Sequence, residues 1–196
     1  MNEWHRLVGA IRDRISNPTT RTDYSDRRHR DIGLPATSAV IEASERAIGC
    51  ALHPLHRRLL QEVGNGGFGP GDGLIGLSGG TLDGNERSIV ELREVLWLDV
   101  DTPLPLPVVP LCDWGHAIYS CIDCETGVVL TLSEDGLKDT GQEFHAWLED
   151  WVSGVDLWKR LVVLEDKVVV NPFTKQAQTV KVVAGTAGTP YLFRAY

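Results

Sequence analysis

Residues 64–76, GNGGFGPGDGLIG, contain seven glycines in thirteen positions. Glycine is used where the backbone takes a positive φ or passes close to other groups, and each glycine costs folding entropy. The run follows a helix-like segment and leads into a short apolar segment, LIGL, so we expect a tight corner between a helix and a strand. Phe68 within it either plugs the core beneath the turn or is displayed. The residues that we expect to build this corner are Asn65, Gly66, Gly67, Phe68, Gly69, Pro70 and Gly73.

Such a run also resembles a phosphate-binding loop, but its context excludes one. The pattern G-x-G-x-x-G occurs twice, beginning at Gly64 and at Gly71. A dinucleotide-binding loop follows a strand and opens a helix, so that the helix N-terminus faces the pyrophosphate. Here the order is reversed, and no Lys-Ser or Lys-Thr pair closes either match. We therefore expect no nucleotide site.

The composition is that of a soluble globular protein. The chain has 196 residues, of which 42% are hydrophobic and 23% charged, and we expect a single domain over 1–196. No apolar stretch is long enough to span a bilayer, and the N-terminal residues lack the apolar core of a signal peptide. The four cysteines form no secreted-type disulfide framework. These features predict a cytoplasmic protein that does not associate with membranes.

Acidic side chains are concentrated in the middle of the chain. Residues 65–156 hold seventeen Asp and Glu against only Arg87, Arg93 and Lys138, a net charge of −14. A field of this sign repels nucleic acid and attracts basic partners. The alternative is a solvated surface that serves only solubility. Because balancing cations are so scarce over this length, we favour a basic protein partner and no nucleic acid.

Hydrophobic spacing and capping signals predict helices that mostly precede the strands. We expect helices over 2–16, from Thr37 or Ser38 to Gly49, and from Pro54 to Gly64. Asn85 is a candidate N-cap for another helix, and Thr140 with Glu143 form a candidate capping box for the last one. Expected strands cover 108–112, 117–122 and 128–132, with a later pair at 168–170 and 180–183; residues 17–35 are expected to be a loop or linker. This order indicates an α+β fold.

Residues 34–77, LPATSAVIEASERAIGCALHPLHRRLLQEVGNGGFGPGDGLIGL, resemble the signature of the SUKH superfamily of Smi/Knr-like proteins. In that family an acidic helix precedes a helix start marked by a Leu-Pro pair, and a second helix ends in N-G-G-x-G before a G-L-x-G-L strand. The resemblance extends over about 34–152, with 1–33 as an N-terminal helix and loop and 160–196 as a C-terminal β extension. One departure is His53, inserted between Leu52 and Pro54. The matching residues are Ile41, Glu45, Gly49, Leu52, Pro54, Leu59, Leu60, Asn65, Gly66, Gly67, Phe68, Gly69, Pro70, Gly73, Leu74, Gly76 and Leu77.

The resemblance implies an α+β, SUKH-like fold in which N-terminal helices pack on a mostly antiparallel sheet. It also implies no catalytic activity and no cofactor. Bacterial members are similar to immunity proteins that neutralise toxins of intercellular competition systems, often nucleases. Fungal members resemble regulatory scaffolds in cell-wall signalling, which is the alternative. Either way the implied activity is protein binding.

A cysteine and histidine group invites a zinc hypothesis. Cys112, His116, Cys121 and Cys124 include one C-x₂-C pair, but structural zinc sites usually combine two such turns. The competing interpretation is that these cysteines are small buried hydrophobes in strands. No nucleophile or metalloprotease motif accompanies the six scattered histidines. We therefore expect no metal and no catalytic residue, with a zinc-dependent enzyme as the weaker alternative.

Trp114 is the leading candidate for a partner contact, because an amphipathic ring between two strands can be displayed as an anchor. The alternative is that it packs on the helix bearing Trp147 and Trp151, which we assign to the core. The other candidate contacts are Asp113, His116, Asp123, Glu125 and Asp72. The combined expectation is an immunity protein that occludes a basic, nuclease-type toxin. The oligomeric state is not predicted.

Overall fold

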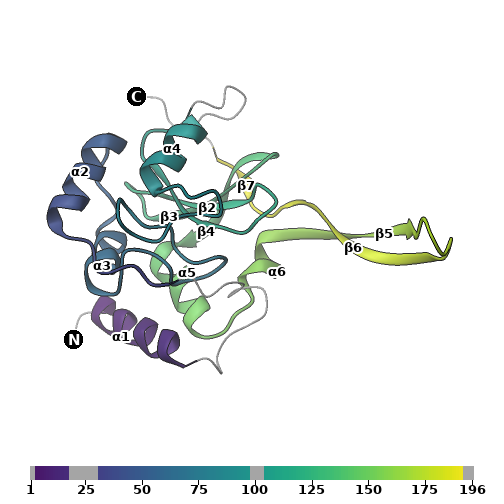
Figure 1. The fold of residues 1–196 in the computed structure, drawn as a ribbon, viewed down its shortest axis with the longest axis horizontal. Helices are drawn as coiled ribbons and strands as arrows, with labels where there is room; N and C mark the ends of the chain where they lie inside the picture. Colours follow the sequence, from purple (N-terminus) through teal and green to yellow (C-terminus); the bar gives the residue numbers. More distant parts are fainter. Residues whose placement is uncertain (1–2, 18–30, 98–103, 192–196) are drawn as a thin grey trace.

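A five-stranded antiparallel sheet forms the centre of the computed structural model, which describes residues 3–17, 31–97 and 104–191 (Figure 1). Every residue of β1 and β2 is buried, so both faces of these two strands are covered. The strands lie in the order β1-β2-β3-β4-β7, and they are β1 (Val108–Asp113), β2 (Tyr119–Asp123), β3 (Val128–Ser133), β4 (Gly136–Glu143) and β7 (Thr189–Pro190).

Helices come before the sheet and after its fourth strand. Those before it are α1 (Glu3–Ser16), α2 (Ser38–Ile48), α3 (Pro54–Glu62) and α4 (Ile89–Trp97), and those after β4 are α5 (Phe144–Val152) and α6 (Leu157–Leu161). Helix α4 packs on β1, α5 packs on β3 and β4, and α1 packs on α3 and α5. The mixed α+β architecture with N-terminal helices and antiparallel strands is therefore confirmed.

The ends of α2 and α3 follow from local capping chemistry. The Thr37 hydroxyl accepts the N–H of Val40 at 3.3 Å, and Gly49 ends α2 with φ 87°. Pro54 occupies the first turn of α3, where its missing N–H costs nothing. His53 precedes it without a side-chain cap, and its ring centroid lies 6.3 Å from that of Trp4 and 6.0 Å from that of Phe144. The inserted histidine thus joins α1 to α5 through aromatic packing.

The glycine run forms the expected corner between α3 and the sheet. Gly66, Gly67 and Gly73 all have φ between 85° and 89°, in the left-handed region. The Asn65 side chain is buried and accepts the N–H of Leu77 at 2.8 Å, which pins the two ends of the run together. After the corner, the expected strand is reduced to a single bridge between Leu74 and Cys112 of β1, next to which the Ile75 N–H donates to the Leu111 carbonyl at 2.8 Å. Phe68 is 3% exposed and belongs to the core.

The predicted cap of α4 is wrong. Asn85 lies outside the helix, in a loop where its N–H donates to the Asp83 carboxylate at 2.9 Å. Ser88 and Glu91 form the reciprocal pair instead, because the Glu91 carboxylate accepts both the N–H (2.8 Å) and the hydroxyl (2.7 Å) of Ser88. This is a capping box three residues further along, at the Ser-x-x-Glu spacing.

The predicted capping box of α5 is also wrong, because its residues belong to a strand that we did not predict. Residues 136–143 form β4, which pairs with β3. The Thr140 hydroxyl donates to the Val129 carbonyl at 2.6 Å. Glu143 precedes α5 without a side-chain cap. The helix itself is confirmed, and its Trp147 and Trp151 are 4% and 2% exposed. β4 lacks an alternating apolar pattern because most of its residues are only half-buried.

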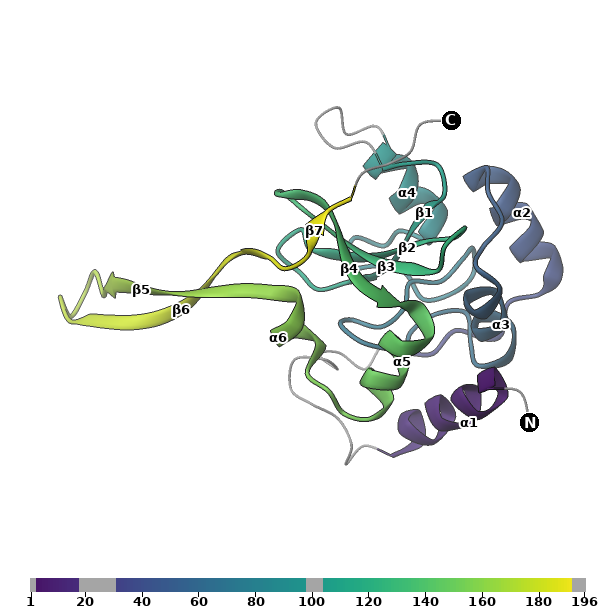
Figure 2. The ribbon, with the colours of Figure 1, turned by 180° about the vertical axis from the view of Figure 1, so that it is seen from behind.

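A long hairpin projects away from the helices (Figures 1 and 2). It consists of β5 (Val162–Val170) and β6 (Ala177–Thr186), which form a sheet of their own. We expected only 168–170 and 180–183, so the pair is confirmed but longer. Helix α6, which we did not predict, precedes it and is capped by Asp156, whose carboxylate accepts the N–H of Lys159 at 3.3 Å.

Some expectations fall partly outside the described residues. The predicted loop at 17–35 includes residues 18–30, which lie outside the described residues. The single-domain organisation over 1–196 remains a prediction. Within the described ranges, no helix is long and apolar enough to cross a membrane.

Candidate protein-binding surface

The six residues predicted to contact a partner fall at two places, at the two ends of β2. Asp72, Asp113, Trp114 and His116 gather at the turn between β1 and β2, where the Asp72 N–H donates to the Asp113 carbonyl at 3.0 Å. Asp123 and Glu125 lie at the turn between β2 and β3. The fold therefore does not bring the six into a single patch.

The β1–β2 turn is strained and presents His116 to solvent. The Asp113 carboxylate is buried and accepts the N–H of Gly115 at 2.7 Å. His116 and Ala117 then take φ of 56° and 55°, a region that non-glycine residues rarely adopt. His116 is exposed and Asp72 half-buried. At this place His116 is thus the candidate most accessible to a partner, while Asp113 holds the turn.

Trp114 does not display its ring, so the expectation of an exposed aromatic anchor is wrong. The residue is 2% exposed, and its indole N–H donates to the Ser120 hydroxyl at 2.9 Å. Its ring centroid lies 6.0 Å from that of Trp158 in α6. A buried indole needs a partner for its N–H, and Ser120 on the neighbouring strand supplies one.

Asp123 is an internal hydrogen-bond acceptor. One carboxylate oxygen accepts the N–H groups of Glu125 (2.9 Å) and Thr126 (3.1 Å), and the other accepts the Tyr191 hydroxyl at 2.6 Å. Burial by itself raises the pKa of the Asp123 carboxyl, but the hydrogen bonds from Tyr191 and from the backbone of Thr126 and Glu125 outweigh it, so the pKa lies below its ordinary value. Asp123 therefore ties the C-terminal segment to the turn that presents Glu125.

Replacing Asp123 with alanine should lower the free energy of unfolding by about 2 kcal/mol, because the half-buried Tyr191 hydroxyl and two turn amides lose their charged acceptor. Urea denaturation at pH 7 measures this. The matched control is Glu125→Ala, two residues away and exposed, which should change the stability by less than about 0.5 kcal/mol. Equal losses in the two variants would contradict the structural role given to Asp123.

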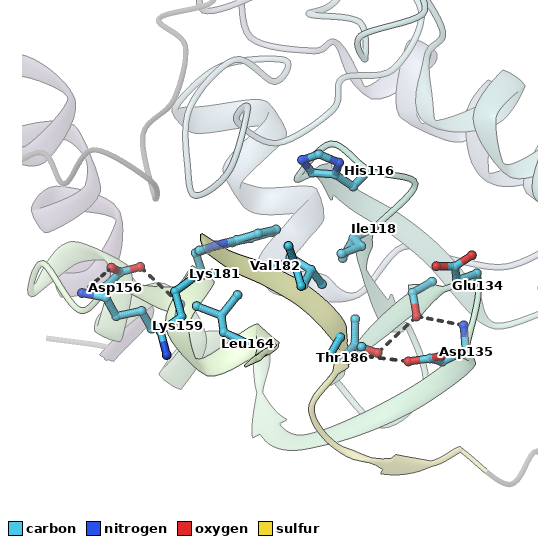
Figure 3. Close-up of a pocket in the computed structure, with 15 residues that line it drawn as sticks. His116, Ile118, Glu134, Asp135, Asp156, Lys159, Leu164, Lys181, Val182 and Thr186 are labelled. Atoms are coloured by element: carbon cyan, nitrogen blue, oxygen red, sulfur yellow. Dashed lines mark hydrogen bonds and ion pairs between the residues drawn. The ribbon is translucent and has the colours of Figure 1, made fainter. Parts of the chain in front are cut away.

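A groove of about 690 Å³ lies between the body and the root of the hairpin (Figure 3). Ile118 and His116 line it from the β1–β2 turn, opposite Leu164 and Val182 of the hairpin. Two of the carboxylates that line it are paired with neighbouring lysines: Asp156 with Lys159 at 3.2 Å, and Asp135 with Lys138 at 3.2 Å. The groove is an apolar cleft with a mixed-charge rim.

The cations of residues 65–156 are all engaged within the protein. Arg87 pairs with the buried Asp83 at 2.7 Å, and Lys138 donates to the Thr186 carbonyl at 2.8 Å as well as to Asp135. Arg93 is 7% exposed and donates to the carbonyls of Leu106 (2.7 Å) and Val108 (3.0 Å). Seven carboxylates of the segment are exposed in the described structure: Glu86, Glu91, Glu94, Glu125, Glu134, Asp135 and Glu143.

Two of these carboxylates flank exposed apolar side chains. Val95 on α4 is 50% exposed beside Glu94, and Leu106 is 49% exposed. The Arg93 contact joins α4 to the Leu106 segment, and the Cys124 N–H donates to the Pro107 carbonyl at 2.8 Å, which places the Glu125 turn next to it. We call Glu91, Glu94, Val95, Leu106 and Glu125 the α4 face. The signal that we overlooked was Val95, an apolar residue outside the apolar stripe of its helix.

The cysteines do not have the arrangement that the zinc hypothesis requires. Cys112 and Cys121 are fully buried on adjacent strands, and burial raises the pKa of both thiols. Cys124 instead shares a hydrogen bond with Cys50 at the end of α2; this bond, together with the nearby Arg93, lowers the pKa of Cys50. Among the described residues, no group of three or more His, Cys, Asp or Glu side chains is placed to hold a metal ion.

Comparison with known families identifies the fold that these features build. Residues 20–153 match the SUKH_5 family, described as SMI1-KNR4 cell-wall, and the chain belongs to this family. The match includes α2 to α5 and the glycine corner, and it ends before α6 and the hairpin. No curated protein and no solved structure matches the chain.

Proposed function

We propose that this chain is a non-catalytic immunity protein that binds a basic, nuclease-type protein toxin and occludes it. Membership of the SUKH family supports a protein-binding role. The observation that carries the electrostatic part is the surplus of exposed carboxylates over residues 65–156, whose three cations are engaged within the protein. Uncompensated charge of one sign speeds association with a partner of the opposite sign.

The α4 face is the surface proposed for the toxin. Protein interfaces combine an apolar centre with a polar rim, and here Val95 and Leu106 supply exposed apolar area beside Glu94 and Glu125. Of the contacts predicted from the sequence, Glu125 belongs to this face. His116 and Asp72 lie at the other end of β2, and Asp113, Trp114 and Asp123 are placed to support the turns.

The test begins with co-expression of the chain and the protein encoded by a neighbouring toxin gene, scoring growth rescue and co-purification. With that complex, Glu94→Lys combined with Glu125→Lys should lower the association rate constant about tenfold or more at low salt. Glu143→Lys, an exposed carboxylate at the start of α5, is the matched control and should have a much smaller effect.

Two results would contradict the proposal in different ways. A toxin affinity that does not change between about 50 mM and 500 mM salt removes the electrostatic mechanism, because screening shortens the Debye length over this range. If no toxin gene lies nearby and no partner co-purifies, the immunity role fails. The alternative is then a regulatory scaffold for endogenous partners, which the description of the matched family as a cell-wall family favours.

A further inference from the structure

The β5–β6 hairpin exposes much more apolar surface than a free ribbon tolerates. Apart from Val162, every residue of β5 is exposed, and the ribbon extends far from the body in both views (Figures 1 and 2). A two-stranded hairpin by itself is marginally stable in water, whereas three or more strands with an apolar face are stable. The exposed apolar side chains are Val163, Leu164, Val168, Val169, Val170, Phe173 and Val183.

One edge of β5 has no strand beside it among the residues that the structure describes. Among the described strands, β5 pairs only with β6, over Val162 to Val170. A long edge strand presents a row of N–H and C=O groups that are ready to pair with another chain, and proteins usually shorten, bend or cover such edges. Here the edge is nine residues long and includes five exposed valine or leucine side chains.

The sequence of β5 is complementary to itself when the strand is reversed about Asp166. In an antiparallel pair centred there, Glu165 lies opposite Lys167 of the other strand, and Leu164 lies opposite Val168. The two residues of each pair lie on the same face of the sheet, because they are equally far from Asp166 and side chains alternate between the two faces along each strand. By symmetry the pairing contains two Glu–Lys pairs and two Leu–Val pairs, which are favourable cross-strand neighbours.

We propose that the β5 edge binds the β5 edge of a second copy of this chain, antiparallel about a two-fold axis at Asp166, to form a four-stranded sheet. At the axis the two Asp166 side chains meet. Each is already paired with Lys181 of its own hairpin at 2.8 Å, so a cation flanks each carboxylate across the sheet. A two-fold contact of this kind closes on itself and does not propagate into a filament.

The charge of the hairpin favours a second copy over the basic toxin. Residues 162–186 carry Glu165 and Asp166 against Lys167, Lys175 and Lys181, a net charge of +1. This surface has no excess negative charge to attract a basic protein, unlike the α4 face, and two copies of it barely repel. The hairpin also lies outside the residues that match the family, so its role is separate from that of the shared fold.

Exchanging the charges of Glu165 and Lys167 tests the proposed register of the two β5 strands. Sedimentation of the full chain over a range of concentrations should show dimers. Glu165→Lys and Lys167→Glu should each raise the dimer dissociation constant roughly tenfold or more, because each variant places like charges opposite twice. An equimolar mixture of the two variants should dimerise like the native chain, since every Lys then faces a Glu. The double variant carrying both changes should also recover.

The control for these charge changes is Glu94→Lys on the α4 face, which should leave the dimer unchanged. Circular dichroism melts show whether each variant is folded. A native chain that stays monomeric at all concentrations overturns the proposal. So does a pair of single variants that dimerise as well as the native chain, or a mixture that remains monomeric.

Crosslinking provides a second readout that does not depend on charge. Only a residue on the two-fold axis meets its own copy, so Asp166→Cys should form an intermolecular disulfide on mild oxidation. Val163→Cys, at the same edge but facing Val169 of the other copy, should not. The native chain sets the background from its own four cysteines. Equal crosslinking of both variants would overturn the register.

Discussion

Replacing Gly66 with alanine is expected to lower the free energy of unfolding by about 3 kcal/mol or more. Gly66 has φ 85°, and an alanine in this region costs about 1–2 kcal/mol. A Cβ there would also lie 2.6 Å from the Gly76 nitrogen and 2.7 Å from the Leu74 carbonyl oxygen. Both are backbone atoms of the corner that make hydrogen bonds: the Leu74 carbonyl accepts the Gly67 N–H at 2.8 Å, and the Gly76 N–H donates to the Thr81 carbonyl at 2.6 Å. Neither atom therefore moves without disturbing a hydrogen bond.

Gly79→Ala is the matched control for this prediction. Gly79 has φ 75°, but a Cβ there meets no atom within 4 Å, so only the conformational cost remains. The control should lose about 1–2 kcal/mol in urea denaturation, clearly less than Gly66→Ala. If the two variants lose the same stability, close backbone approach is not what requires glycine in the corner.

The second large effect is expected on acidification, and His56 is its source. The ring is fully buried, and neither nitrogen has a hydrogen-bond partner among the described residues. Burial, with a smaller effect of His53, lowers the pKa of His56 to about 3. Below about pH 6.5 His56 binds a proton in the unfolded chain, whereas in the folded chain its buried ring stays neutral until the pH is much lower. The free energy of unfolding therefore decreases as the pH is lowered, by about 2–3 kcal/mol between pH 7 and pH 4.5.

His56→Leu should remove most of this slope, as measured by urea denaturation at several pH values. The remaining part comes from His53, whose pKa burial also lowers. Carboxylates with lowered pKa, such as Asp123, lose their contribution only below about pH 4, outside this window. His116→Gln, at an exposed position, should keep the native slope. A slope unchanged in His56→Leu would show that the buried ring does not control acid stability.

Local signals predicted helices α1 to α5 and the first three strands of the central sheet. Thr37 caps α2, Gly49 ends it and Pro54 starts α3, because each acts on its own turn of backbone. β4 was missed because its half-buried residues lack alternation, and its Thr140 and Glu143 imitate a capping box. Capping chemistry alone does not distinguish a helix start from a strand that bonds to a neighbour far along the chain.

The candidate surface was less predictable than the fold. Glu125 is exposed as expected, but Asp113 and Asp123 accept internal hydrogen bonds and Trp114 is buried. Counting charges along the chain treats each carboxylate as a surface group. Whether a carboxylate faces solvent depends on donors that the fold brings to it, and for Asp123 the decisive donor is 68 residues away.

The sequence by itself determined the glycine corner, the helix caps around it and hence the family, because positive φ and capping are properties of a few consecutive residues. Only the tertiary structure decided how the acidic residues divide between surface and interior, which ring covers Trp114, and that Cys124 meets Cys50 instead of forming a site with Cys121. Burial and hydrogen-bond satisfaction are set by contacts between distant segments, so they appear only when the sheet, the helices and the hairpin are in place.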